Sequence, residues 1–309
     1  DAFTRRIESL LKEIKRLSDN DYKFWSVAFH PNKKLIATGN ISNEKKTVKI
    51  WSIQSGKVIT SLGGHRGAIQ SVAFDPQGKR LVSGAWWDKA PNGPVLWDTS
   101  TWRPIRRFPL TGFDLSGGLI VSPSRREMVT SNGEKLTWWD LDTGRALHEI
   151  KGWRIPAPID FAMDGTLLAV AHPDMSIGIW DIRSGKLVRK LRGNVRGPTT
   201  VAFSPDGRWL ASGTTGKAGD ATVQVWDVKS GKKAATLAGH ARGGQFVDFS
   251  SDGGLLASAG SRGVVKLWDT HTWKPLRTLE GGLGRVCFLS FSPDGDVLAY
   301  GTETKVIIR

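Results

Sequence analysis

Three Ser-Gly-Lys turns are the first candidates for chemistry, because glycine and lysine together can cradle a phosphate group. They are Ser55-Gly56-Lys57, Ser184-Gly185-Lys186 and Ser230-Gly231-Lys232. All three lack the length of a phosphate-binding loop and the helix that must follow it. The sequence therefore indicates that these segments are turns between strands and not nucleotide sites.

Nucleophiles, general acids and metal ligands are equally sparse. No Gly-x-Ser-x-Gly elbow occurs, and His172-Pro173-Asp174 lies in a predicted loop with no nucleophile placed beside it. The six histidines are scattered, and the single cysteine, Cys287, can form neither an internal disulfide nor a thiolate cluster. We therefore assign no catalytic residue, no metal and no cofactor, and we predict a protein that is not an enzyme.

Arginine is the residue type whose placement repeats. In five places an arginine stands six to eight residues before the phenylalanine of a predicted strand. A guanidinium fork binds carboxylate or phosphate at two points, and the net charge of +15 also favours an acidic partner. The alternative is that a strongly basic chain places arginine in many loops by chance. The five residues are Arg66, Arg154, Arg196, Arg242 and Arg285.

Tryptophans in predicted loops could act as exposed anchors for a partner. Trp86, Trp87 and Trp153 lie in or beside such loops, and Trp153 directly precedes Arg154. Aromatic side chains are enriched among the residues that dominate binding energy, although we favour the interpretation that these tryptophans pack within their loops. We include Trp153 with the five arginines as a candidate partner-binding residue.

The elements that position these residues repeat along the whole chain. Six tryptophans are separated by 46, 42, 41, 46 and 42 residues, and all but the first are followed by aspartate. Upstream of each lie alternating segments that end in a turn, such as residues 201–207, and then a strand of small residues, such as 210–213. The six are Trp51, Trp97, Trp139, Trp180, Trp226 and Trp268.

Each repeat of about 42 residues therefore contains four short strands, which is the spacing of propeller blades. No helical stretch separates the strands, so parallel βαβ folding is excluded. A single four-stranded blade cannot bury both of its faces, so the blades must stack radially and the ring must close. The sequence predicts an all-β propeller.

The chain resembles the WD-repeat β-propellers. The resemblance rests on the Trp-Asp pairs and on Gly64-His65 and Gly239-His240, and it covers about residues 22–309. It implies a seven-bladed propeller of four-stranded antiparallel sheets over 22–309, preceded by a helix and linker over 1–21. The period places Arg309 where the seventh blade would carry its tryptophan. The resemblance also implies that the arginines line an entrance face on which peptides dock.

The same resemblance implies a buried set of His, Ser or Thr, Asp and Trp in each blade. The second blade comes closest, with His65, Ser83, Asp88 and Trp97. In the fifth, Asn194 stands at the histidine position, and in the sixth Arg262 stands at the aspartate position. We expect these replacements to leave several blades dependent on packing, since an unmet buried donor costs about 1 to 3 kcal/mol.

The two ends depart most from the family. Ile7, Leu10, Leu11, Ile14 and Leu17 have helical spacing, which predicts a helix over residues 4–17, either a packed cap or part of a linker or coiled coil. The chain stops after the third strand of the seventh blade. We expect the fourth strand to lie beyond this fragment; the alternative is a three-stranded blade with a covered edge. A first residue other than Met indicates a processed or truncated piece.

Our leading hypothesis is a non-catalytic scaffold or sensor that docks acidic or phosphorylated protein segments on the Arg-rich face. The alternatives are a nucleic-acid-binding propeller and a regulatory domain of a larger multidomain protein. A catalytic site in the channel would require a metal or paired carboxylates there. The lone cysteine and the lack of a long apolar run favour a reduced, cytoplasmic setting without membrane insertion.

Overall fold

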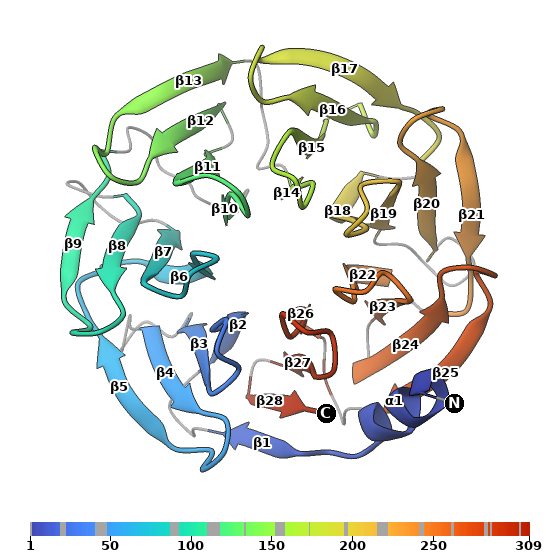
Figure 1. Ribbon diagram of the computed structural model, residues 1–309, viewed down its shortest axis with the longest axis horizontal. Helices are drawn as coiled ribbons and strands as arrows, with labels where there is room; N and C mark the ends of the chain where they lie inside the picture. Colours follow the sequence, from blue (N-terminus) through green and yellow to red (C-terminus); the bar gives the residue numbers. More distant parts are fainter. Residues whose placement is uncertain are drawn as a thin grey trace.

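The chain folds into seven four-stranded antiparallel sheets arranged around one axis (Figure 1). This confirms the predicted seven-bladed propeller. The innermost strand of each sheet lies beside the axis and the fourth strand lies at the rim. The computed structural model describes residues 2–18, 23–40, 48–86, 93–109, 118–132, 134–151, 158–172, 174–194, 197–214, 222–240, 244–260, 263–280, 284, 286–302 and 304–309.

The blades follow the chain, and each sheet runs from the axis outward in sequence order except the last. Blades 1 to 3 contain β2 (Phe24–Phe29), β3 (Leu35–Asn40), β4 (Val48–Ser52), β5 (Val58–Leu62), β6 (Ala68–Phe74), β7 (Arg80–Trp86), β8 (Val95–Asp98), β9 (Pro104–Arg107), β10 (Leu119–Val121), β11 (Glu127–Ser131), β12 (Lys135–Asp140) and β13 (Ala146–Lys151). Blades 4 to 6 contain β14 (Ile159–Phe161), β15 (Leu167–Ala171), β16 (Ile177–Asp181), β17 (Lys186–Leu191), β18 (Pro198–Phe203), β19 (Trp209–Thr214), β20 (Val223–Asp227), β21 (Lys233–Leu237), β22 (Gly244–Phe249), β23 (Leu255–Gly260), β24 (Val264–Asp269) and β25 (Pro275–Glu280). Blade 7 contains β26 (Phe288–Phe291), β27 (Leu298–Thr302), β28 (Lys305–Ile308) and β1 (Lys15–Ser18), and the helix α1 spans Ala2–Leu11.

The repeated tryptophan packs between neighbouring blades and is also bonded inside its own blade. In five blades the indole Nε1–H donates to a hydroxyl on the second strand, two residues after the residue that pairs with the tryptophan. A buried indole N–H needs such an acceptor, so one hydroxyl fixes the ring. The bonds are Trp51 to Thr38 (2.9 Å), Trp97 to Ser83 (2.8 Å), Trp139 to Thr130 (2.9 Å), Trp226 to Ser212 (3.3 Å) and Trp268 to Ser258 (2.8 Å).

Histidine extends this bond in two blades. Ser83 Oγ lies 2.8 Å from Nε2 of His65, and Ser258 Oγ lies 2.7 Å from Nε2 of His240. In blade 5 the Ser212 hydroxyl donates to Oδ1 of Asn194 at 3.0 Å, so the amide takes the histidine's place. The predicted aspartate positions, Asp88 and Arg262, lie outside the described residues.

The aspartate that follows the tryptophan caps the turn into the fourth strand. Oδ1 of Asp98 accepts the backbone N–H groups of Ser100 and Thr101, each at 2.9 Å. Where blade 1 has serine instead, Ser52 Oγ accepts the backbone N–H of Ser55 at 3.2 Å. Ser52 therefore caps the same turn as the aspartates of the other repeats, with an uncharged hydroxyl as the acceptor.

Blade 7 places Arg309 at the position of the missing tryptophan, as the repeat period predicted. Leu298 and Arg309 exchange backbone hydrogen bonds of 2.8 and 3.0 Å, which is the register that Leu256 and Trp268 have in blade 6. Nε of Arg309 donates to the Tyr300 hydroxyl at 2.9 Å. Arginine and tyrosine thus reproduce the indole-to-hydroxyl bond with different side chains.

The fourth strand of blade 7 comes from the N-terminal segment, which corrects two expectations. The helix ends at Leu11, and β1 pairs antiparallel with β28, with Lys15 opposite Ile308 and Leu17 opposite Val306. The last blade is therefore complete, with no strand needed from beyond the fragment. The position of Leu17 fits both the spacing of a helix and the alternation of a strand. The segment forms a strand because it pairs with the edge of β28, which would otherwise have unpaired backbone groups.

Helix α1 is a packed cap beside β25 and the last strand of the chain (Figure 1). Ile7 and Leu10 are buried in one hydrophobic cluster with Leu255 of blade 6 and Leu298 of blade 7. Of the two interpretations left open for the predicted helix, this burial supports the cap.

Replacing Leu17 with alanine tests ring closure. Leu17 is fully buried against Phe24 and Phe288, so Leu17→Ala is expected to lower the free energy of unfolding by about 2 to 5 kcal/mol. Ile14→Ala is the control, since Ile14 is 54% exposed and its loss should cost less than about 0.5 kcal/mol. Equal urea midpoints for the two variants would contradict closure by β1.

The serine in the blade 6 core allows a second test. Ser258→Ala leaves the buried Trp268 Nε1–H and His240 Nε2 without their shared partner, which should cost about 1 to 3 kcal/mol in urea unfolding. Ser61→Ala, on the exposed face of β5, removes the same atom and should cost little. A Ser258 variant as stable as the Ser61 variant would show that packing alone holds the ring.

Candidate interaction surfaces

The disc presents two faces with different connections. On the entrance face, the chain passes from the rim of one blade to the axis of the next, as in residues 63–67 between β5 and β6. On the turn face, tight turns join the first strand to the second and the third to the fourth, as in residues 75–79 between β6 and β7. Side chains on either face can therefore gather from several blades.

Of the six predicted site residues, the described structure places Arg66. Arg66 is exposed on the entrance face, in the connection to β6, and its neighbours His65 and Gly67 are buried. His65 is bonded to Ser83 inside the blade, so the backbone that carries Arg66 is anchored on one side. The other five, Trp153, Arg154, Arg196, Arg242 and Arg285, lie outside the described residues.

A second basic side chain contacts the connection that carries Arg66. Nη2 of Arg107, on β9, donates to the carbonyl of Gly64 at 2.7 Å. A similar hydrogen bond occurs in blade 5, where Nζ of Lys233 donates to the carbonyl of Gly193 at 3.0 Å. Basic side chains of fourth strands thus bind carbonyls of the entrance connections and add positive charge there. Sequence spacing alone did not predict these basic side chains.

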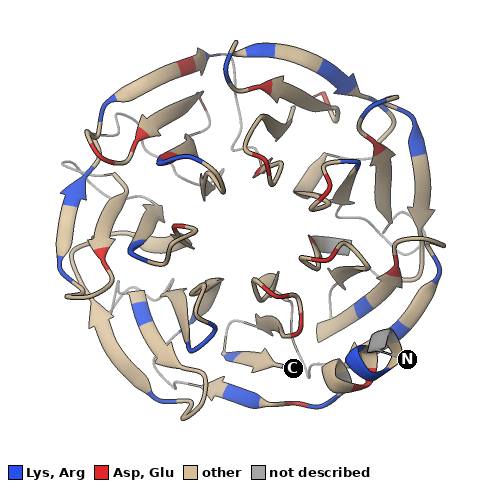
Figure 2. Ribbon diagram, viewed as in Figure 1, with Lys and Arg blue, Asp and Glu red and all other residues tan. Residues whose placement is uncertain are grey.

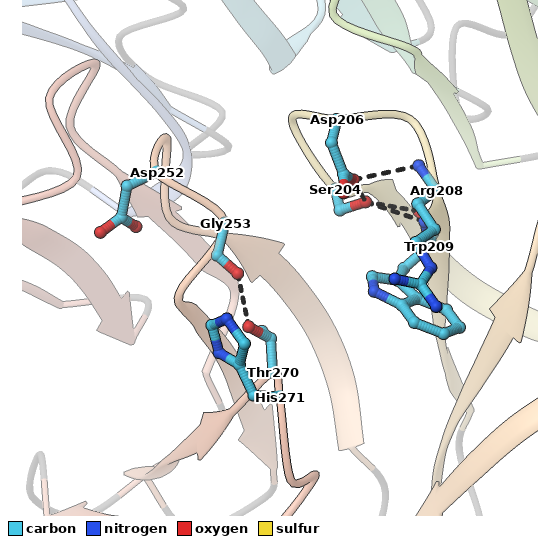
Figure 3. Close-up of a pocket in the computed structure, with 8 residues that line it drawn as sticks. All are labelled: Ser204, Asp206, Arg208, Trp209, Asp252, Gly253, Thr270 and His271. Atoms are coloured by element: carbon cyan, nitrogen blue, oxygen red, sulfur yellow. Dashed lines mark hydrogen bonds between the residues drawn. The ribbon is translucent and has the colours of Figure 1, made fainter.

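The turn face carries a cleft of about 310 Å³ between blades 5 and 6 (Figure 3). The turn that holds Ser204 and Asp206 forms one wall, and two turns of blade 6, one with Asp252 and one with Thr270, form the other. The Arg208 guanidinium lies 4.3 Å above the centre of the Trp209 ring. Sequence spacing did not predict this cleft, because residues 204–207 were interpreted only as the turn that ends a strand. The lining residues are Ser204, Asp206, Arg208, Trp209, Asp252, Gly253, Thr270 and His271.

The turns between first and second strands differ in charge around the ring (Figure 2). These turns carry aspartate in blades 4 to 7 and lysine or arginine in blades 1 to 3. Blade 5 also has a basic residue in its turn and blade 2 an acidic one. The acidic turn residues are Asp75, Asp164, Asp206, Asp252, Asp294 and Asp296; the basic ones are Lys33, Lys34, Lys79, Arg125, Arg126 and Arg208.

Two carboxyls stand at matching positions on innermost strands. Asp160 Oδ2 accepts the backbone N–H of Phe203 in the next blade, and Asp248 Oδ2 accepts that of Phe291, both at 2.7 Å. Burial raises the pKa of Asp160 to about 8 and that of Asp248 to about 7. The charge of Asp248 raises the pKa of Asp160 further. Both carboxyls brace adjacent blades.

The part of the chain that the structure describes contains no group of three or more His, Cys, Asp or Glu side chains arranged to hold a metal ion. It also contains no helix of the length and apolarity needed to cross a bilayer.

A family model fits this chain at the residues that form the blades. The model described as WD domain, G-beta repeat matches residues 11–52, 56–90, 185–227, 231–269 and 273–308, which is more than half of the sequence. The chain belongs to the WD-repeat family. The first match includes β1, which completes the last blade of this WD-repeat propeller.

Blade 3 and the first three strands of blade 4 lie outside the matched segments, and yet both blades form complete sheets. Blade 4 lacks the hydroxyl acceptor, because Val170 stands two residues after Leu168, the partner of Trp180. Trp180 stacks instead on His172, with ring centres 6.2 Å apart and planes 10° from parallel. In blade 4, a ring contact within the blade thus stands where other blades have the bond from the indole to a hydroxyl.

Known WD-repeat relatives are much longer than this chain. It is 30% identical over 192 residues to Autophagy-related protein 16 of Arabidopsis thaliana, covering 61% of this chain and 36% of the relative. It is 26% identical over 195 residues to Pre-mRNA-processing factor 19 of Oryza sativa subsp. japonica (60% and 35%). It is also 26% identical over 193 residues to Periodic tryptophan protein 2 homolog of Schizosaccharomyces pombe (55% and 22%). The chain spans about a third or less of their length.

The raised pKa values of Asp160 and Asp248 predict how the stability of the protein depends on pH. Both pKa values are raised on folding, so between about pH 4 and pH 8 the folded protein retains protons that the unfolded chain releases. The free energy of unfolding should therefore fall as the pH rises through this window. In the Asp160→Asn/Asp248→Asn variant that decline should flatten. Denaturant unfolding at about pH 5 and about pH 8 measures it, and equal slopes in both proteins would contradict the assignment.

Proposed function

We propose that this WD-repeat propeller is a non-catalytic interaction module that docks acidic or phosphorylated protein segments on its entrance face. The observation that carries the proposal is Arg66, exposed on a connection whose neighbouring histidine is bonded into the blade. Arg107 adds a second cation at the same connection. A guanidinium held on a fixed backbone binds carboxylate or phosphate with little ordering cost.

The repeat extends the same chemistry around the channel mouth. Arg154, Arg196, Arg242 and Arg285 occupy the corresponding sequence positions of four other blades. An extended acidic segment lying across the mouth would meet several of them, and shared binding to one segment raises affinity without new contacts. Trp153 would supply an apolar anchor beside Arg154.

The family comparison supports an assembly role. The relatives are named as an autophagy-related protein, a pre-mRNA-processing factor and a periodic tryptophan protein, and none of these names refers to a reaction. Because the chain spans about a third of these proteins, we further propose that it serves as the interaction domain of a longer protein. The single buried cysteine supports a reducing, cytoplasmic location.

Charge reversal on the entrance face tests the docking proposal. Arg66, Arg154, Arg196 and Arg242 are changed together to Glu, and binding to immobilised polyglutamate and phosphoserine peptides is measured by interferometry. The variant should lose at least about tenfold in affinity, since each lost charged hydrogen bond costs about 1.5 to 3 kcal/mol. The matched control changes Lys57, Arg103, Arg145 and Lys274 to Glu, four exposed residues that follow turns on the opposite face.

The outcomes separate the proposal from its alternative. Equal peptide binding by the two charge-reversed proteins would show that net charge, and not the entrance face, governs the interaction. Tight binding of a labelled single-stranded oligonucleotide at low salt, with no peptide binding, would favour the nucleic-acid alternative.

A further inference from the structure

Aspartates recur at one position of the turn between first and second strands. The position is occupied by Asp164, Asp206, Asp252 and Asp294 in blades 4 to 7. In blades 5 to 7 its Oδ1 accepts the hydroxyl of a serine two residues earlier and a backbone N–H two residues later. One carboxylate oxygen thus holds the turn, and Oδ2 remains for another partner.

In two blades Oδ2 binds a cation from another part of the chain. Asp252 Oδ2 pairs with Nη1 of Arg6 on α1, and Asp294 Oδ2 pairs with Nζ of Lys33 in blade 1. Burial would raise the pKa of Asp294, but hydrogen bonds from Lys33 and Ser292 lower it to about 2. The turn position therefore works as a cation receptor when a cation is within reach.

Arg6 shows how a helix uses this receptor. Its guanidinium lies between two blades, with Nη1 on Asp252 and Nε 3.1 Å from the carbonyl of Gly295, the equivalent glycine of the next turn. The following apolar residues, Ile7 and Leu10, are buried between the same two blades. The chain thus displays an arginine-bearing amphipathic helix seated on a junction between blades.

The junction between blades 5 and 6 has the same receptor without a cation. Asp206 Oδ1 accepts the Ser204 hydroxyl at 2.5 Å and the Arg208 backbone N–H at 3.0 Å. Among the described residues, no Lys or Arg side chain pairs with the Asp206 carboxylate. Gly253 stands where Gly295 stands one blade later, and its carbonyl accepts the Thr270 hydroxyl with one of two lone pairs.

The space at this junction is the cleft of about 310 Å³ shown in Figure 3. Arg208 does not use the Asp206 carboxylate, because its guanidinium lies over Trp209 and its Nε is 4.0 Å from Oδ2 of Asp227. Trp209 supplies apolar surface in this wall. An incoming cation therefore meets an anionic oxygen, a carbonyl and an aromatic ring.

We propose that the cleft between blades 5 and 6 binds an arginine-bearing amphipathic helix of a partner protein. The guanidinium bridges Asp206 Oδ2 and the Gly253 carbonyl, and the next apolar residues pack on Trp209. Arginine is preferred over lysine because its fork reaches acceptors on two turns at once. The Asp206 carboxylate, which lines the cleft and pairs with no described Lys or Arg side chain, attracts such a segment. This site is on the opposite face from the proposed acidic-peptide surface and does not depend on it.

The chain's own helix provides the probe. A fluorescent peptide of residues 2–12 is held helical by a lactam between its Glu8 and Lys12 side chains, both of which are exposed in the protein. We expect one-to-one binding to the full chain that weakens as salt is raised. Asp206→Asn should weaken it at least about tenfold, because the charged pair is lost while the turn keeps an oxygen acceptor. The same peptide with Arg6→Gln should lose a similar factor.

Matched controls keep the result specific. Asp164→Asn alters the equivalent turn of blade 4, where Thr166 already donates to Oδ2 of Asp164, and should leave binding unchanged. Equal binding by wild type and the Asp206 variant would overturn the proposal. So would a loss caused by Asp252→Asn and not by Asp206→Asn, since the peptide would then be replacing α1 in its own seat. Absence of binding at about millimolar peptide would overturn it as well.

Discussion

A four-stranded blade has two apolar faces, and each can be buried only against a neighbouring blade. Every sheet in this protein therefore depends on an unbroken ring, and the ring is closed by the hydrogen bonds between β1 and β28. Leu17 carries the closure into the core, because it packs between the last blade and Phe24 of the first. The interactions within a blade, such as the hydrogen bond from the Trp268 indole to Ser258, fix the arrangement of its four strands, and the closed ring holds the seven blades together.

Features set by local repetition could be predicted from the sequence, and features set by distant contacts could not. The tryptophan period gave the blade count and placed Arg309 correctly, because register within a blade is decided by a few neighbouring strands. The strand character of Lys15–Ser18 escaped prediction, because only the distant edge of β28 favours it over helix. Of the candidate site, Arg66 is placed as expected on an exposed entrance connection. The use of Asp206 Oδ2 could not be read from a turn motif, since it depends on which cations neighbouring blades bring near.

Acidic side chains recur at one turn position of blades 4 to 7 in an otherwise basic molecule. The chain has a net charge of +15 and yet carries four aspartates at one turn position. Two of them, Asp252 and Asp294, form ion pairs with Arg6 and Lys33. Asp160 and Asp248 differ from these surface aspartates, because burial favours their neutral forms. Each accepts a hydrogen bond from a backbone N–H of the next blade. Family membership explains the scaffold, whereas the choice of partner depends on these residue-level differences between blades.

Blade 7 combines the segment before blade 1 with the segment after blade 6, and this separation along the chain affects how the propeller folds during synthesis. Lys15–Ser18 is synthesised before the rest of the propeller and Lys305–Ile308 after it, so the outer strand has no partner until all the other blades have been translated. Contacts of such large sequence separation form slowly, and unpaired strand edges are prone to aggregate in the interval. Helix α1, which covers apolar surface of blades 6 and 7, must likewise dock after those blades emerge.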